Sequence, residues 1–131
     1  MQVEGFIKDG IDPRNTDSSR RSGAHFAAAR GEQPVLELLH SKGIDLDAED
    51  ERSRAPLHYA ALGNHEGTVK YLVERGCWVD ACDGADDTPL HCAARCGAAE
   101  AAARLLKCGA KAHLRNALDL TPLGALVKVS T

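Results

Sequence analysis

The chain repeats itself every 33 residues, and this recurrence constrains its fold more than any other feature. Segments 55–61 (APLHYAA) and 88–94 (TPLHCAA) are nearly identical, and weaker copies occupy 22–28 and 121–127. A glycine recurs in the same phase at positions 10, 43, 76 and 109, as does an acidic or amide residue at 17, 50, 83 and 116. Three markers in register indicate a stack of similar units.

Each repeat begins with the sequence signals of a short helix. Thr88 can accept a backbone hydrogen bond as the cap, and Pro89 suits the first helical position. Leu90 and Ala93 are three residues apart and therefore share one helix face, where the small alanine lets another helix approach. Gly97 predicts the end of this helix in a left-handed cap.

A second helix is predicted to follow, and Pro34 marks its start in one copy. The side chains expected to face inward are Val35, Leu38 and Leu39, then Val69, Leu72 and Val73, then Ala102, Leu105 and Leu106. A glycine ends each of these helices, and a polar stretch carrying the aspartate series predicts a turn. The unit is therefore helix, turn, helix and a projecting turn.

This period and the Thr-Pro-Leu-His-x-Ala-Ala signature resemble the ankyrin repeat. The resemblance implies a mainly helical solenoid with projecting β-turn fingers, forming a single domain over residues 1–131. It implies three full repeats at 22–54, 55–87 and 88–120, a partial repeat at 2–15 and a truncated repeat at 121–131.

Two repeats depart from the ankyrin signature. Gly23 and Ala24 replace Pro-Leu in the first full repeat, and Gly124 replaces the histidine in the last. Because a solenoid needs a polar outer cap, we expect the leucines near the C-terminus to be only partly covered. The chain is then expected to continue in a longer protein, or this end to pack on another molecule.

The same resemblance implies that the chain binds another protein through the fingers and a concave groove along the first helices. It would act as an interaction module such as a scaffold or adaptor or, alternatively, as an inhibitor that blocks an enzyme or transcription factor. The implied contact positions are Arg21, Glu51, Arg52, Arg54, Asp87 and Leu120 on the fingers, and Arg30, Leu62, Arg95 and Cys96 in the groove. A partner segment with acidic groups at one end and apolar groups at the other fits this sequence of charges.

Trp78 is unusual for its position, which in ankyrin repeats usually holds a small polar residue. It can anchor a partner or fold onto the neighbouring repeat. Because single exposed apolar side chains need no binding role, we expect the second arrangement.

Catalytic and metal sites are discounted from the pattern. Histidines at 25, 58 and 91 recur with the repeat, as a structural hydrogen bond does and a catalytic group does not. Cys92 and Cys96 are spaced like two metal ligands, but no second pair accompanies them. An enzyme using Cys92 with His91 is a further alternative, although consecutive helical side chains point about 100° apart. We therefore predict no catalytic residue, no metal and no cofactor.

Composition narrows the partners and the compartment. The chain has 16 Lys+Arg, 19 Asp+Glu and 4% aromatic residues, which argues against nucleic-acid binding. No apolar run reaches the length of about 18 residues that a membrane helix requires, and residues 1–9 lack the apolar stretch of a secretory signal. Five cysteines without framework spacing favour reduced thiols in the cytoplasm or nucleus.

Overall fold

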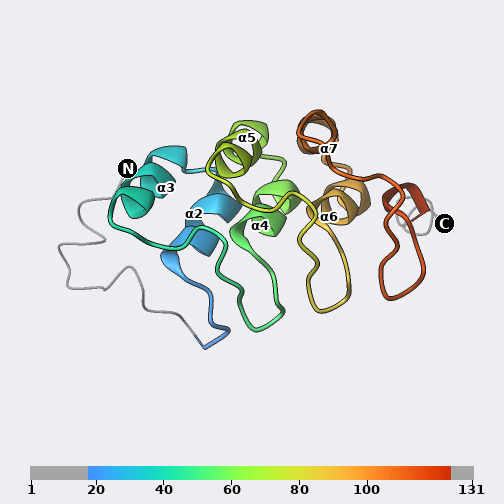
Figure 1. Ribbon diagram of the computed structural model, residues 1–131, viewed down its shortest axis with the longest axis horizontal. Coiled ribbons are helices and arrows are strands. Elements are labelled where there is room, and N and C mark those ends of the chain that lie inside the picture. The colour runs from blue at the N-terminus through green and yellow to red at the C-terminus, as the bar shows by residue number, and fades with distance from the viewer. Residues whose placement is uncertain (1–17, 125–131) are drawn as a thin grey trace.

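A computed structural model describes residues 18–124. These residues form three successive pairs of helices. The pairs are α2 (Gly23–Arg30) with α3 (Gln33–Ser41), α4 (Pro56–Leu62) with α5 (Glu66–Glu74), and α6 (Pro89–Arg95) with α7 (Ala99–Lys107). They stand side by side along the long axis, with loops projecting from one side (Figure 1). The mainly helical solenoid is confirmed, while the predicted partial repeat at 2–15 and most of that at 121–131 lie outside the described residues.

The predicted helix start at Thr88 is confirmed. The Thr88 hydroxyl accepts a hydrogen bond from the His91 N–H at 3.3 Å, and Pro89 occupies the first turn. In return, His91 Nδ1 accepts from the Thr88 N–H at 3.1 Å. This reciprocal arrangement satisfies two backbone N–H donors at once, as a capping box does. At the start of α4, Ala55 donates its N–H to the equivalent nitrogen of His58 at 3.1 Å.

Left-handed residues end the first helices, as predicted for Gly97. Gly31, Asn64 and Gly97 have φ values of 69°, 58° and 68°. Glycine has no Cβ to clash in this conformation, and asparagine is among the side chains that tolerate it. The chain therefore reverses within a few residues and places each second helix against the first.

The core consists of leucines and alanines on the facing sides of the helices. Leu57, Ala60 and Ala61 of α4 are fully buried between neighbouring repeats. Small alanines bring the helices close, and burial of each leucine contributes roughly 1.5–3 kcal/mol before entropic costs. The first helices α2, α4 and α6 pack on one another in sequence. The core is therefore continuous along the stack.

The predicted inward face of the second helices needs two corrections. Leu36 is fully buried although it was not predicted, whereas the predicted Leu38 is only partly covered. Val35 is partly buried and packs against the core, as predicted. Leu106 is half exposed, although the pattern placed it on the inward face. The exposed side chains of Leu118 and Leu123 agree with the expected partial cover at this end.

A histidine in each repeat joins it to the next repeat. The Nε2 atoms of His25, His58 and His91 lie 2.8–2.9 Å from the carbonyl oxygens of the residues 29 positions later, Arg54, Asp87 and Leu120. Since each Nδ1 accepts from the backbone of its own repeat, each Nε2 carries the proton and donates it. These contacts confirm the structural role expected for the recurring histidines. Burial lowers the pKa of His58 and keeps that ring neutral.

Replacing His58 by alanine should destabilise the stack. The Ala55 N–H and the Asp87 carbonyl lose their partner, and we expect the free energy of unfolding to fall by roughly 1–3 kcal/mol. Urea unfolding at neutral pH measures this loss. The control is His113→Ala, since His113 is exposed. Equal midpoints for the two variants would contradict the structural role.

Candidate functional site

The projecting loops form one continuous surface with the first helices. Figure 1 shows α2, α4 and α6 between the second helices and the loops. The turns at residues 18–19, 51–52, 84–85 and 117–118 form the tips of the loops, which we call fingers. We define the finger surface as these tips together with the exposed sides of α2, α4 and α6.

Backbone hydrogen bonds join adjacent fingers at their tips. The N–H of Glu51 donates to the carbonyl of Ser19 at 2.8 Å, and Gly84 donates in the same way to Arg52. The N–H of Ala117 completes the series with the carbonyl of Ala85 at 2.9 Å. The tips are therefore held together before any partner arrives, which reduces the ordering cost of binding.

The recurring aspartates hold each finger from within. Asp50 Oδ1 accepts from the N–H groups of Arg52 and Arg54, both at 2.9 Å. Asp83 and Asn116 bind the backbone two and four residues further on in the same way. These contacts confirm the predicted turn chemistry, in which a short polar side chain bonds its own backbone.

Arg54 serves the structure of the stack and is not displayed at a finger tip. Its Nε donates to Asp83 Oδ2 at 3.1 Å, and only 17% of its side chain is exposed. Its guanidinium carbon also lies 5.9 Å from the centre of the Tyr59 ring. Arg54 thus joins the first full repeat to the second, a role that its position in a polar turn did not indicate.

The expectation that Asp87 presents its carboxylate on the third finger is wrong. Asp87 is 3% exposed, and its Oδ1 and Oδ2 accept from Asn116 at 2.9 Å and from Arg95 at 2.8 Å. Burial raises the pKa of this carboxyl, but the hydrogen bonds from Asn116 and Arg95 outweigh burial, and the pKa lies below its usual range. Arg95 is held by the same contact at the edge of the surface.

The remaining predicted contact residues reach the solvent to different degrees. Exposed side chains are those of Arg30, Glu51, Arg52 and Cys96, and partly covered ones are those of Arg21, Leu62, Arg95 and Leu120. Arg30 pairs with Glu32 at 2.9 Å. Leu62 packs against the core and leaves only part of its side chain on the surface.

A hollow of about 270 Å³ lies between the first two fingers. The structure brings four predicted residues together here, and the complete lining is Ser19, Arg21, Asp50, Glu51, Arg52, Arg54 and Tyr59. It does not include the predicted groove residues or those of the last two fingers. Sequence reasoning missed Tyr59, whose hydroxyl donates to Asp50 Oδ2. It also missed Phe26, which is 44% exposed beside Arg21.

One signal for these two aromatic residues was present in the sequence. Phe26 and Tyr59 occupy the same position of successive repeats, directly after the recurring histidine. Each lies beneath an arginine that comes five residues earlier, at 5.2 Å for Arg21 and 5.9 Å for Arg54. Such cation–π pairs form where a guanidinium lies within about 6 Å of a ring centre.

The Trp78 side chain faces the solvent, and the expectation that it folds onto the neighbouring repeat is wrong. It is 63% exposed. Its backbone N–H donates to Asp47 Oδ2 of the preceding loop at 3.3 Å.

The groups nearest to a metal site do not suit a metal ion. Ligand atoms of Asp83, Asp87 and Cys92 lie within 4.8 Å of one another. Arg54 and Arg95 already donate to the two carboxylates, and burial raises the pKa of the Cys92 thiol to about 12. A protonated thiol between two ion pairs does not favour binding a cation.

The Cys92–His91 arrangement of the enzyme alternative also lacks a base. Both ring nitrogens of His91 are engaged, Nδ1 with Thr88 and Nε2 with the carbonyl of Leu120. The geometry therefore offers no ring nitrogen for proton transfer from the thiol.

A family model described as ankyrin repeats in three copies matches residues 3–83 and 24–116. The chain belongs to the ankyrin-repeat family. Ankyrin repeats are generally protein–protein interaction modules and are typically not enzymes. No curated protein matches the chain. Within residues 18–124, every helix is too short or too polar to cross a bilayer.

Replacing Asp87 by asparagine should weaken the ankyrin stack at neutral pH. The amide cannot accept from both Arg95 and Asn116 as the carboxylate does, and we expect a loss of roughly 1–3 kcal/mol in unfolding free energy. The pKa of Asp87 in the folded protein lies below its ordinary value of 3.8, so the carboxylate contributes fully to stability at pH values well above 3.8. This contribution declines as the pH falls toward the pKa of the folded state.

Urea unfolding over a pH series tests both statements, and Asp86→Asn is the control because Asp86 is exposed in the same finger. The Asp87 variant should lose less stability than the wild type between neutral and acidic pH. Parallel pH curves for the two proteins would contradict the assignment.

The thiols of the ankyrin repeats should differ in reactivity. Cys82 and Cys96 are exposed, whereas Cys77 and Cys92 are buried with pKa values raised to about 12 by burial. Since the thiolate is the reacting form, a maleimide should label the exposed pair first in the native protein, and all five thiols in urea. Mass mapping of the labelled peptides gives the order. Early native labelling of Cys92 would be inconsistent with its placement in the core.

Proposed function

We propose that the ankyrin repeats of this chain bind a partner protein through the finger surface. The observation that carries this proposal is the series of hydrogen bonds joining the tips, which hold exposed side chains in a preformed arrangement. Asp50 and Asp87 use their carboxylates in hydrogen bonds within the protein. The exposed side chains at the finger tips are therefore the ones available for recognition. Glu51 and Arg52 are the clearest examples.

The chemistry of the surface changes along the row of fingers. Arg52 is exposed on the second finger, and Asp86 replaces the buried Asp87 as the acidic group of the third. Leu118 on the fourth finger is 75% exposed. This order supports the predicted partner segment, with acidic groups toward the first fingers and apolar groups toward the last.

The proposed role is that of an interaction module, as in an adaptor or scaffold. An inhibitor of an enzyme or transcription factor would use the same surface, and an activity assay on the purified partner separates the two roles. The five free thiols support a reducing compartment, the cytoplasm or nucleus.

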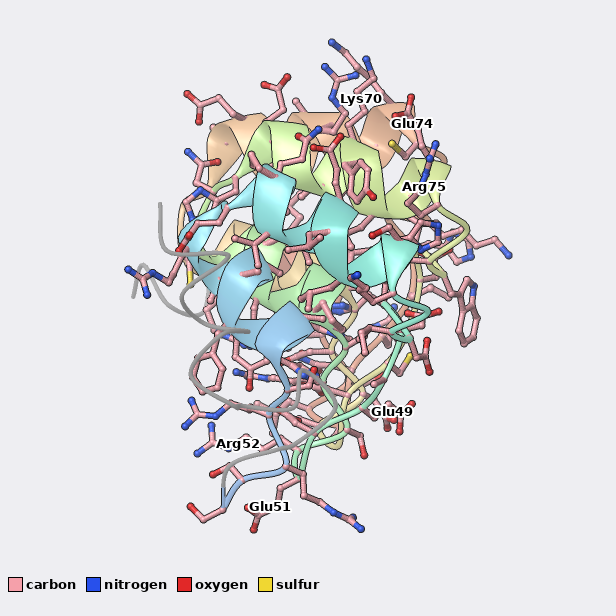
Figure 2. All side chains as sticks on the ribbon, turned by 90° about the vertical axis from the view of Figure 1, so that its left-hand side faces the viewer. Glu49, Glu51, Arg52, Lys70, Glu74 and Arg75 are labelled. Atoms are coloured by element: carbon pink, nitrogen blue, oxygen red, sulfur yellow. The ribbon has the colours of Figure 1, made fainter. Side chains whose placement is uncertain are left out.

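A pair of matched double variants tests the proposed surface. Arg30→Glu with Leu118→Ser changes one charge and one exposed leucine on the finger surface. Lys70→Glu with Leu106→Ser makes the same changes on α5 and α7, and Lys70 lies at the end of the molecule opposite the fingers (Figure 2). Proteins retained by the wild-type chain are identified by mass spectrometry, and their affinities for each variant are then measured.

The finger-surface variant should bind the partner at least about tenfold more weakly, since exposed anchors at an interface centre contribute most of its energy. The control should bind like the wild type. Retained binding by the first variant, with loss by the control, would place the partner on the second helices and refute the proposal.

A further inference from the structure

We propose that the hollow between the first two fingers receives an aspartate or glutamate side chain of an extended acidic partner segment, with Arg52 as its cationic contact. Phe26 then offers an apolar surface to the partner residue next to that acid. This inference rests on the proposed function and specifies the chemistry of the partner at one part of the finger surface.

Two of the charges that line the hollow are already used within the protein. Asp50 accepts from two backbone N–H groups and from the hydroxyl of Tyr59. Arg54 donates across to Asp83 and is largely buried. These groups shape the hollow, but they do not add a charge that a partner must neutralise.

Arg52 is the cation best placed for a partner. Its side chain is exposed, it lines the hollow, and within residues 18–124 it forms no ion pair or side-chain hydrogen bond. Hydrogen bonds hold both polar groups of its backbone, because the N–H donates to Asp50 and the carbonyl accepts from Gly84. A guanidinium on a fixed backbone can form two parallel hydrogen bonds with a carboxylate, which gives both strength and direction.

The charges of the second finger are divided between its two sides. Figure 2 shows Arg52 and Glu49, which belong to the same finger, pointing to opposite sides of it. The Glu49 side chain is therefore directed away from Arg52. An approaching anionic segment meets a cation on the side of the hollow, and long-range attraction favours its approach there.

The lining favours a carboxylate over a phosphate. Glu51 and Asp50 belong to the same hollow as Arg52. Together with Arg21 and Arg54, these residues give the lining one net positive charge. A carboxylate balances this charge, whereas a phosphate group, with nearly two negative charges at neutral pH, leaves an excess of negative charge in the hollow.

Phe26 defines the neighbouring contact. Its ring is 44% exposed, and the guanidinium carbon of Arg21, which also lines the hollow, lies 5.2 Å from the ring centre. An apolar side chain beside the partner acid can cover this ring and remove it from water. The structure therefore points to an acidic residue with an apolar neighbour.

A synthetic peptide tests the chemistry without a known partner. The probe is a fluorescein-labelled peptide with two glutamates separated by a leucine in a glycine–serine background, titrated with the full chain in fluorescence anisotropy. Peptides with glutamine or phosphoserine in place of glutamate are titrated in parallel. We expect the glutamate peptide to bind most tightly.

Three variants locate the site. Arg52→Ala should weaken binding of the glutamate peptide about tenfold, as for loss of a hydrogen-bonded ion pair, and Phe26→Ala about threefold. The matched control is Arg115→Ala, which removes the same charge from the fourth finger, where 61% of the Arg115 side chain is exposed. It should bind the peptide like the wild type, and circular dichroism checks that all variants remain helical.

Several results would overturn this inference. They are absence of binding by the glutamate peptide, equal weakening by Arg52→Ala and Arg115→Ala, or tighter binding of the phosphoserine peptide. The proposed function would be judged separately, by the Arg30 and Leu118 variant against a captured protein. A partner sensitive to that variant but not to Arg52→Ala would leave the proposed function in place and remove the acidic contact.

Discussion

The stack depends on a hydrogen bond that each repeat makes with the next. The ring of His58 accepts from the start of its own helix and donates to the backbone at the base of the following finger. A helical pair of this size cannot bury enough apolar surface alone, so contacts between neighbours supply much of its stability. The histidine adds direction to this packing, because the carbonyl must lie where the ring nitrogen points. It thereby sets where each finger leaves the core.

A second set of contacts converts charged residues at the finger bases into structural links. Arg54 reaches Asp83 of the next repeat, and one repeat further on Asn116 reaches back to Asp87. The chemistry of the link changes from an ion pair to an amide–carboxylate hydrogen bond, while its place in the repeat is kept. Charge at these positions therefore says little about what the surface recognises. Under the proposed function, recognition is left to the exposed residues at the tips.

The helices and their ends could be predicted from the sequence because their signals are local. Thr88 and Pro89 start a helix through their own chemistry, and left-handed Gly97 ends it whatever its neighbours are. The failures concern contacts between repeats. Asp87 resembles a solvated turn residue until Asn116, 29 residues later, is placed against it. Trp78 shows the reverse case, because a large apolar side chain that was expected to be covered by the neighbouring repeat is 63% exposed.

The same distinction applies to the candidate site. Arginines at the first fingers were predicted from their repeat positions, and Arg52 is exposed as expected. The hollow beside it was not predictable, because residues that are far apart in the sequence, such as Arg21 and Tyr59, line it together.

The linked finger tips have an evolutionary consequence. Their backbones are held by main-chain bonds, as between Glu51 and Ser19, which any residue except proline at the donor position can form. Side chains at the tips can therefore change by mutation without loss of the architecture. A lineage of such proteins can exchange one binding partner for another through single substitutions, while the helices behind the tips stay the same.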